Sequence, residues 1–126
     1  MDIEQLIPEF NAFQQEFPDF DLFIILASDG EVLYSSNPEK VNPEETRSLM
    51  HAWLKRESAC MFGQKRYPIL SWEPLQFAAR NVKGKDALVG TITQSSYYLL
   101  AHLKAGAELA PAIGAIQLNR KFWKLI

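Results

Sequence analysis

The side chains that most often carry catalytic or metal chemistry are sparse in this sequence. It has two histidines, His51 and His102, and one cysteine, Cys60. None of the three has a cysteine, histidine or carboxylate pair nearby at the spacing of a zinc site. Cys60 also lacks a local nucleophile motif. We therefore expect partly exposed or interface histidines and a buried or incidental thiol.

The acidic residues that stand in pairs have structural explanations. Asp29 and Glu31 flank a turn glycine, and Glu44 and Glu45 lie where a helix begins, so turn and capping chemistry accounts for both pairs. The glycines do not follow the spacing of a phosphate-binding loop. The sequence thus predicts no catalytic residue, no cofactor and no metal, and a protein that is not an enzyme.

The composition is that of a globular domain. The chain has 126 residues, 48% of them hydrophobic, and a net charge of −2, which allows a sizeable core and gives no basic surface for nucleic acid. Its apolar runs are too short for membrane insertion. A single cysteine and an N-terminus without signal-peptide features lead us to expect a cytoplasmic protein.

A β-hairpin within residues 21–36 organises the chain. Residues 22–27 are an apolar run rich in β-formers, which is typical of a strand buried on both faces. Residues 32–34 give a more polar second strand. Asp29-Gly30 between them is a strong hairpin signal, because glycine adopts a positive φ without steric cost. We expect the first strand inside a sheet and the second at its edge.

Two helices are predicted on either side of this hairpin. Apolar residues within residues 3–17 are spaced three, four and seven apart, and this helix is expected to begin near Ile7 or Pro8. The second helix follows Asn42, with Pro43 in its first turn and Glu45 placed to complete a capping box. Its apolar stripe consists of Leu49, Met50, Trp53 and Leu54.

Three further strands are predicted, at residues 67–72, 75–80 and 87–93. Pro68 favours an edge position for the first of them, because proline cannot donate a hydrogen bond to a ladder. Residues 95–103 carry apolar residues at helical spacing after a pair of serines. Residues 109–126 are expected to form an extra helical segment that is broken or in two parts.

The predicted order is therefore α-β-β-α-β-β-β-α. It defines an α/β fold of the α+β type, with a five-stranded antiparallel sheet and helices packed on it. The second and third strands are expected at the edges, and the first and fifth inside. A single domain is expected over residues 1–126, with its core at about residues 5–108 and the extra segment at 109–126.

Several strings in the sequence resemble the roadblock family, which includes roadblock-type dynein light chains and the late-endosomal adaptor subunits of Ragulator. They are residues 5–8 (QLIP), 29–36 (DGEVLYSS), 48–53 (SLMHAW), and the strand pair 67–82 and 87–93. Profilins share this topology. The resemblance implies a non-enzymatic dimeric adaptor or scaffold that binds or regulates a small Ras-like GTPase, or assembles with related subunits.

The resemblance also implies a dimer interface. Members of the family pair their third strands into one continuous sheet, and their second helices meet across the two-fold axis. In a homodimer, or a heterodimer with a related domain, this places eight residues at the interface: Leu49, Met50, Trp53, Leu54, Tyr67, Ile69, Leu70 and Trp72. An exposed apolar edge strand is prone to aggregate, and pairing with a second copy would cover it.

Two alternatives remain open at this point. A divergent profilin-like cytoskeletal binding module has the same element order. Aromatic residues of its first and last helices would bind proline-rich peptides, and the candidates are Phe10, Phe13, Phe122 and Trp123. Phe122 and Trp123, flanked by lysines, are also candidate partner-binding residues. A small-ligand sensor or enzyme would need a polar cavity, for which the sequence offers no convergent titratable groups.

Overall fold

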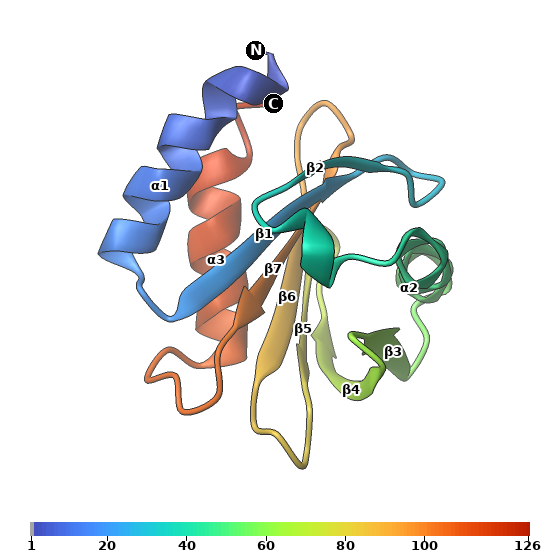
Figure 1. Cartoon of the computed structure of the whole chain (residues 1–126). Helices are drawn as coiled ribbons and strands as arrows, with labels where there is room; N and C mark the ends of the chain where they lie inside the picture. Colours follow the sequence, from blue (N-terminus) through green and yellow to red (C-terminus); the bar gives the residue numbers. More distant parts are fainter. Residues whose placement is uncertain (1) are drawn as a thin grey trace.

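Residues 2–126 are described by a computed structural model and form a seven-stranded antiparallel sheet with helices on both faces (Figure 1). The helices are η1 (Ile3–Leu6), α1 (Ile7–Glu16), η2 (Pro38–Lys40), α2 (Pro43–Lys55) and α3 (Pro111–Phe122). The strands are β1 (Phe20–Leu26), β2 (Val32–Ser35), β3 (Ala59–Phe62), β4 (Lys65–Trp72), β5 (Gln76–Arg80), β6 (Ala87–Ile92) and β7 (Tyr98–Leu103).

The order of strands across the sheet is β2-β1-β7-β6-β5-β4-β3. Helices α1 and α3 lie side by side on one face, and α2 lies on the other (Figure 1). The α+β class and the antiparallel sheet are as predicted, as are the edge position of β2 and the inner positions of β1 and β6. The predicted number of five strands is wrong.

One missing strand is β7, which the sequence led us to expect as a helix. It lies at the centre of the sheet, between β1 and β6. Leu99 and Ala101 face the core under α1 and α3, while Leu100 faces the core under α2. A strand that is apolar on both faces shows no polar alternation, so a short run of this kind has no period that separates strand from helix.

The other missing strand is β3, which covers the edge that was predicted for β4. β4 pairs with β3 on one side and with β5 on the other, so it is not an edge strand. Pro68 is tolerated because the ladder between β4 and β5 begins only at Ile69. The edge position predicted from Pro68 is therefore wrong, because a proline can lie in an internal strand at a point where one ladder has not yet begun.

The turn of the β1–β2 hairpin packs directly on α2. Gly30 has a φ of +90°, and a Cβ at this position would lie 2.6 Å from the Cα of Arg47. The hydroxyl of Thr46 donates a hydrogen bond of 2.9 Å to the carbonyl of Gly30. Glycine is therefore required here both for the turn and for the approach of the helix.

The start of α2 agrees with the prediction in part. The side chain of Asn42 accepts a hydrogen bond from the N–H of Glu44, at 3.0 Å. Glu45 does not close a capping box. Its carboxylate accepts instead from the backbone N–H groups of Gly63 and Gln64 in the β3–β4 turn, at 2.6 and 3.0 Å. Glu45 thus ties a distant hairpin to α2.

Each face of the sheet has its own core. On the α1 and α3 face, the ring of Phe10 stacks on Phe23 and Phe122, with centroids 5.0 and 4.7 Å apart. On the α2 face, Trp53 packs edge-to-face on Phe77, with centroids 4.7 Å apart. A large side chain buried in this way contributes about 1.5–3 kcal/mol, so these rings hold the helices on the sheet.

The C-terminal segment forms one continuous helix, where a broken one was expected. Pro111 lies in the first turn of α3, where a missing N–H costs nothing. Gly114 lies inside the helix and lets it approach the sheet, since a Cβ there would be 3.1 Å from the Leu103 side chain. Within residues 2–126, no helix is both long and apolar enough to cross a bilayer.

Candidate docking surface

The layer of α1 and α3 does not cover the whole of its face of the sheet. Among the described residues, α3 packs on β5 and β6, and β4 and β3 beyond them carry no helix on this side. Cys60 and Tyr67 point into the core under α2. Their strand neighbours Met61 and Arg66 lie directly opposite each other in the ladder and point to the uncovered side.

A β-bulge raises the apolar exposure of this strip. The register between β4 and β5 shifts between Ile69 and Ser71, which leaves Leu70 as the extra residue. Its side chain is 59% exposed. A large aliphatic side chain held out in the middle of a sheet face is an unusual feature for a surface that stays in water.

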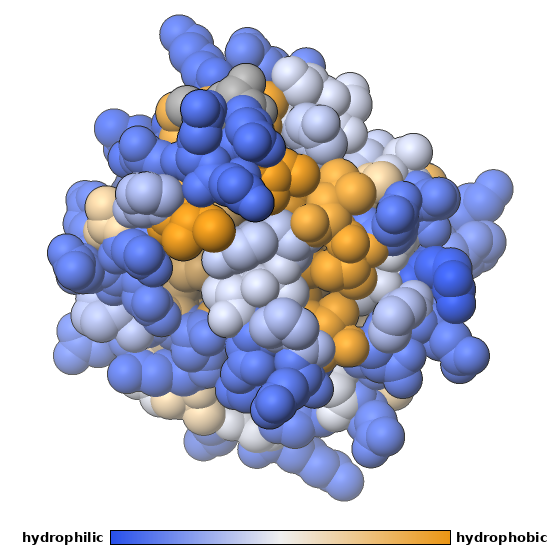
Figure 2. Space-filling view, turned by 45° about the horizontal axis from the view of Figure 1, so that its top comes forward, coloured by the Kyte–Doolittle hydropathy of each residue, from blue (hydrophilic) through white to orange (hydrophobic). Residues whose placement is uncertain are grey.

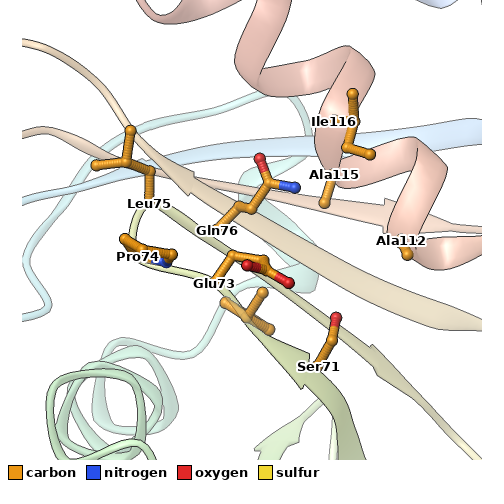
Figure 3. A pocket seen from close by; sticks show the side chains of 9 residues that line it. Ser71, Glu73, Pro74, Leu75, Gln76, Ala112, Ala115 and Ile116 are labelled. Carbon is orange, nitrogen blue, oxygen red and sulfur yellow. The ribbon is translucent and has the colours of Figure 1, made fainter.

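A groove between α3 and the β4–β5 turn continues the strip (Figure 3). Its volume is about 380 Å³. Figure 3 shows the side chain of Gln76 pointing from β5 toward Ala115 of α3, with Leu75 and Ile116 on the two rims. Leu75 and Ile116 are both exposed.

A second hollow lies at the other end of β4. It has a volume of about 660 Å³ and is formed by the β3–β4 and β5–β6 turns, with Arg66, Pro68, Val82 and Lys83 among its lining residues. Val82 is the most exposed large hydrophobic residue of the described chain. The two hollows and the strip along β4 between them are together called the β4 face below. The exposed apolar residues on the elements that form it are Met61, Leu70, Leu75, Val82, Ile113 and Ile116.

Exposed apolar residues are gathered locally in this molecule. Figure 2 shows hydrophilic side chains over most of one face of the molecule, with hydrophobic residues gathered in a band near its middle and in smaller groups elsewhere. Single exposed apolar side chains need no explanation, but a contiguous set of them marks an interaction surface. Six of the eight exposed large hydrophobic residues of the described chain lie on the elements that form the β4 face.

The eight residues predicted for a dimer interface do not come together on one surface. Leu49, Met50, Trp53 and Tyr67 are buried in the core under α2. Ile69 and Trp72 are partly buried beside them. Leu54 and Leu70 are 54% and 59% exposed, on α2 and on the β4 face respectively. The stripe of α2 faces its own sheet, so most of these side chains are used in folding.

The two aromatic residues predicted to bind a partner have different surroundings. Phe122 is fully buried between α1 and the sheet. Trp123 is partly exposed, and its carbonyl accepts a hydrogen bond of 3.0 Å from the N–H of Gln94. A partner-binding role for this pair stays a prediction.

Two of the three residues first considered for catalytic or metal chemistry, His51 and Cys60, have no partner for such a role among the described residues. His51 is exposed on α2, 3.5 Å from the carboxylate of Glu57. Burial raises the pKa of Cys60 to about 12, so its thiol is protonated at neutral pH. Within residues 2–126, no three histidine, cysteine or acidic side chains are grouped so as to hold a metal ion.

Sequence reasoning missed one cluster of titratable groups. It joins His102 of β7 to Asp21 and Asp86, which lie 81 and 16 residues away along the chain. Once residues 98–103 are read as a strand buried on both faces, a histidine within that strand becomes the signal, because such a side chain needs polar partners. The helical interpretation of this segment hid it.

Comparison with known proteins found no matching family model. A relative, Loki profilin-3 from Lokiarchaeum sp. (strain GC14_75), is 35% identical over 100 residues, which cover 79% of this chain and 80% of that protein.

Three solved structures are similar in fold. LokiProfilin1, in its complex with rabbit actin, has a TM-score of 0.78 at 12% identity and covers 96% of this chain and 93% of its own. LokiProfilin2, also in complex with rabbit actin, has a TM-score of 0.77 at 14% identity over 100% of both chains. Profilin IA of Acanthamoeba castellanii has a TM-score of 0.65 at 18% identity over 82% of each chain.

The fold is thus that of the profilins, small proteins with one antiparallel sheet between two helical layers. The sequence identity to Loki profilin-3 goes beyond the fold: this chain belongs to the profilin family.

The resemblance to the roadblock family is therefore wrong, and with it the predicted homodimer, the adaptor role and the small GTPase as partner. Its strings describe a hairpin and a sheet-covering helix that both families possess. SLMHAW includes the apolar stripe of α2, which is dictated by packing on a sheet and carries no information about a partner.

Proposed function

We propose that this protein binds actin through the β4 face. Membership of the profilin family supports the proposal, as do the two similar structures that are complexes of LokiProfilin1 and LokiProfilin2 with rabbit actin. The observation that carries it is the strip of sheet beside α3 that no helix of residues 2–126 covers.

The β4 face has the anatomy of a protein-binding surface. Its centre is apolar, with Leu70 held out by the bulge and Ile116 on the adjoining helix. Its borders carry charged side chains, with Arg66 and Lys83 at one hollow and Glu73 at the other. Apolar residues at the centre and polar groups at the rim are what a non-obligate interface requires.

We infer from the family that the protein acts by binding and not by catalysis. The exposed large hydrophobic residues of the β4 face have no titratable group, and Cys60, the one thiol of the chain, is buried on the opposite side of the sheet. A surface of this kind offers recognition by shape and apolar contact.

The test is the affinity of the protein for monomeric actin. Leu70→Glu and Ile116→Glu each place a charge at the centre of the β4 face and are expected to weaken binding at least tenfold, because burying one aliphatic side chain contributes about 1.5–3 kcal/mol. Leu54→Glu is the matched control, since Leu54 is similarly exposed but lies on α2. Its affinity should equal that of the unmodified protein.

Circular dichroism and thermal melting of each variant show whether it is folded. If the folded protein does not bind actin, or if Leu54→Glu weakens binding as much as Leu70→Glu, the proposal is refuted. Rabbit actin is a suitable first probe, because it is the actin in the similar complexes.

A further inference from the structure

A histidine between two carboxylates lies at one end of the sheet, on the side of α2. The Nδ1 of His102 is 2.6 Å from Oδ1 of Asp21 in β1, and its Nε2 is 2.6 Å from Oδ2 of Asp86, which directly precedes β6. The side chains of His102 and Asp86 are only 18% and 5% exposed. Contacts this short at both ring nitrogens are charge-assisted hydrogen bonds.

Two carboxylates that face the ring favour a proton on each of its nitrogens. A neutral imidazole has one N–H donor, so one of the two carboxylates would face a lone pair at 2.6 Å. The imidazolium donates to both. The arrangement in the structure is therefore that of the charged ring.

Asp86 depends on the donors that meet at one of its oxygens. Its Oδ2 also accepts a hydrogen bond of 2.5 Å from the hydroxyl of Tyr67 and lies 3.9 Å from the ammonium of Lys65. Its Oδ1 is buried and has no hydrogen-bond partner among residues 2–126. A buried carboxylate that loses one of these donors is under-satisfied and moves toward water.

The Tyr67 hydroxyl connects this cluster to the β3–β4 hairpin. The ladder between β4 and β5 begins at Ile69, so residues 65–68 pair in the sheet with β3. Side chains tie this outer half of the hairpin to the rest of the fold. Asp86 holds Tyr67, and the amide of Asn81 donates to the carbonyl of Arg66 at 2.8 Å.

The tip of the hairpin is held separately. Glu45 of α2 accepts from the N–H groups of Gly63 and Gln64. Of the ties on the outer half, the hydrogen bond from Tyr67 and the ion pair of Lys65 both end on Asp86, the group that a histidine proton controls.

We propose that His102 is a pH-sensitive latch for the outer half of the β3–β4 hairpin. The imidazolium fixes the carboxylate of Asp86, which holds Tyr67 and keeps residues 65–68 closed on the sheet. When the ring loses a proton, it keeps one N–H for two carboxylates. In the tautomer that keeps this proton on Nδ1, Asp86 loses a donor, its hold on Tyr67 weakens and the outer half of the hairpin opens more often. The latch does not depend on the proposed binding of actin.

The groups that face His102 set the direction of the pH response. Burial by itself lowers the pKa of His102, but the hydrogen bonds and charges of Asp21 and Asp86 outweigh it and raise the pKa above 6.5. Lys65 of β4 and Lys40 of η2 line the same hollow and favour the neutral ring, but the carboxylates are in direct contact with it.

The other two groups near the latch do not titrate in the same range. Burial raises the pKa of Tyr67, and so does its hydrogen bond to Asp86, so the phenol stays protonated. Burial favours neutral Asp86, but the hydrogen bonds from His102 and Tyr67 outweigh it and lower the pKa of Asp86. The latch is thus closed at mildly acidic pH, below 6.5, and it opens as the pH rises through the raised pKa of His102.

The experiment is backbone amide exchange measured by NMR between pH 6 and pH 9, together with the titration of the His102 ring. After correction for the intrinsic pH dependence of exchange, amides of residues 65–67 should exchange about tenfold faster at the alkaline end, relative to those of β1 and β6. The midpoint should follow that of the His102 ring and lie above 6.5.

His102→Gln should remove the pH dependence and leave the hairpin in fast exchange at pH 6, while His51→Gln, at an exposed histidine, should behave as the unmodified protein. If His102→Gln does not fold, Tyr67→Phe serves instead, because it cuts the link and keeps the histidine. A ring that titrates below 6.5, or hairpin exchange that ignores the state of the ring, overturns the proposal.

Discussion

At the scale of single residues, close packing decides which side chains this fold tolerates. Gly90 in β6 lies under the aromatic pair of the α2 core, and a Cβ there would be 2.6 Å from Trp53 and 2.3 Å from Phe77. Both neighbours are buried rings with little freedom to move. The glycine is therefore required by the two aromatic rings that lie against it.

We expect Gly90→Ala to destabilise the protein by about 1–3 kcal/mol, because the added methyl group overpacks this core. Urea unfolding monitored by circular dichroism measures the loss. Trp53→Phe in the same chain makes room, so the two substitutions should together cost less than the sum of their separate effects. Strict additivity would contradict the packing argument.

His102 should make stability depend on pH. Because its pKa is raised in the folded state, its contribution is fully present below about pH 6.5, the ordinary value for histidine, and disappears as the pH rises through the folded value. His102→Gln should therefore destabilise the protein at pH 6, by about 1.5–3 kcal/mol for a buried charged hydrogen bond. Unfolding curves at pH 6 and pH 9 should converge at the higher pH; a constant difference would contradict the assignment.

At the scale of elements, long-range contacts decide the assignments that local pattern leaves open. The capping signal at Asn42 and Pro43 locates the start of α2 correctly, because capping is a local interaction. Glu45 fits the same local motif, but its carboxylate holds the β3–β4 turn, 18 and 19 residues away. Nothing in the spacing of residues 42–45 distinguishes the two uses.

Glu45→Gln should weaken the tie between α2 and the β3–β4 turn. Replacing a charged acceptor of two N–H groups by a neutral one is expected to cost about 1 kcal/mol and to speed amide exchange at Gly63 and Gln64. Glu44→Gln is the matched control, because Glu44 occupies the same turn of α2 and its side chain makes no hydrogen bond to residues 2–126. If the two variants lose the same stability, the loss comes from their shared interaction with the helix dipole, and the tie through Glu45 contributes nothing.

The seam between α1 and α3 should not bind proline-rich peptides. Such peptides dock on exposed aromatic faces, but Phe10, Phe13 and Phe122 are buried here, and an ion pair of 2.8 Å between Glu9 and Lys121 joins the two helices. A titration with a proline-repeat peptide should leave the tryptophan fluorescence unchanged. A saturable change would show that the helices separate or that the partly exposed Trp123 supplies a site.

At the scale of the whole molecule, the sequence contains enough for the class of the fold but not for its family. The N-terminal helix, the hairpin and α2 follow from apolar spacing, the Asp29-Gly30 turn and the Asn42 cap, all of which are local. The central strand β7 and the edge strand β3 are defined by their partners across the sheet. Because the sequence predicts five of the seven strands, the predicted element order fits the roadblock family as well as it fits a profilin.

The site could not be predicted for a related reason. The sequence predicts that Leu70 belongs to an apolar edge strand that a second copy covers. In the structure β3 covers that edge, and a bulge turns Leu70 outward. Neither feature has a signal in the local sequence. The groove at α3 joins residues of β5 to Ala112, Ala115 and Ile116, some 35 to 40 positions later in the chain. The apolar surface of the molecule is therefore a product of topology.

The most direct test of the proposed function is to map which amides monomeric actin protects, by hydrogen–deuterium exchange of the unmodified protein. The account predicts protection in β4, in the β4–β5 turn and in the first half of α3, with β2 and α2 unchanged. Protection centred on α2 or β2, or none at a saturating actin concentration, would contradict the central claim that the β4 face is the surface that binds actin.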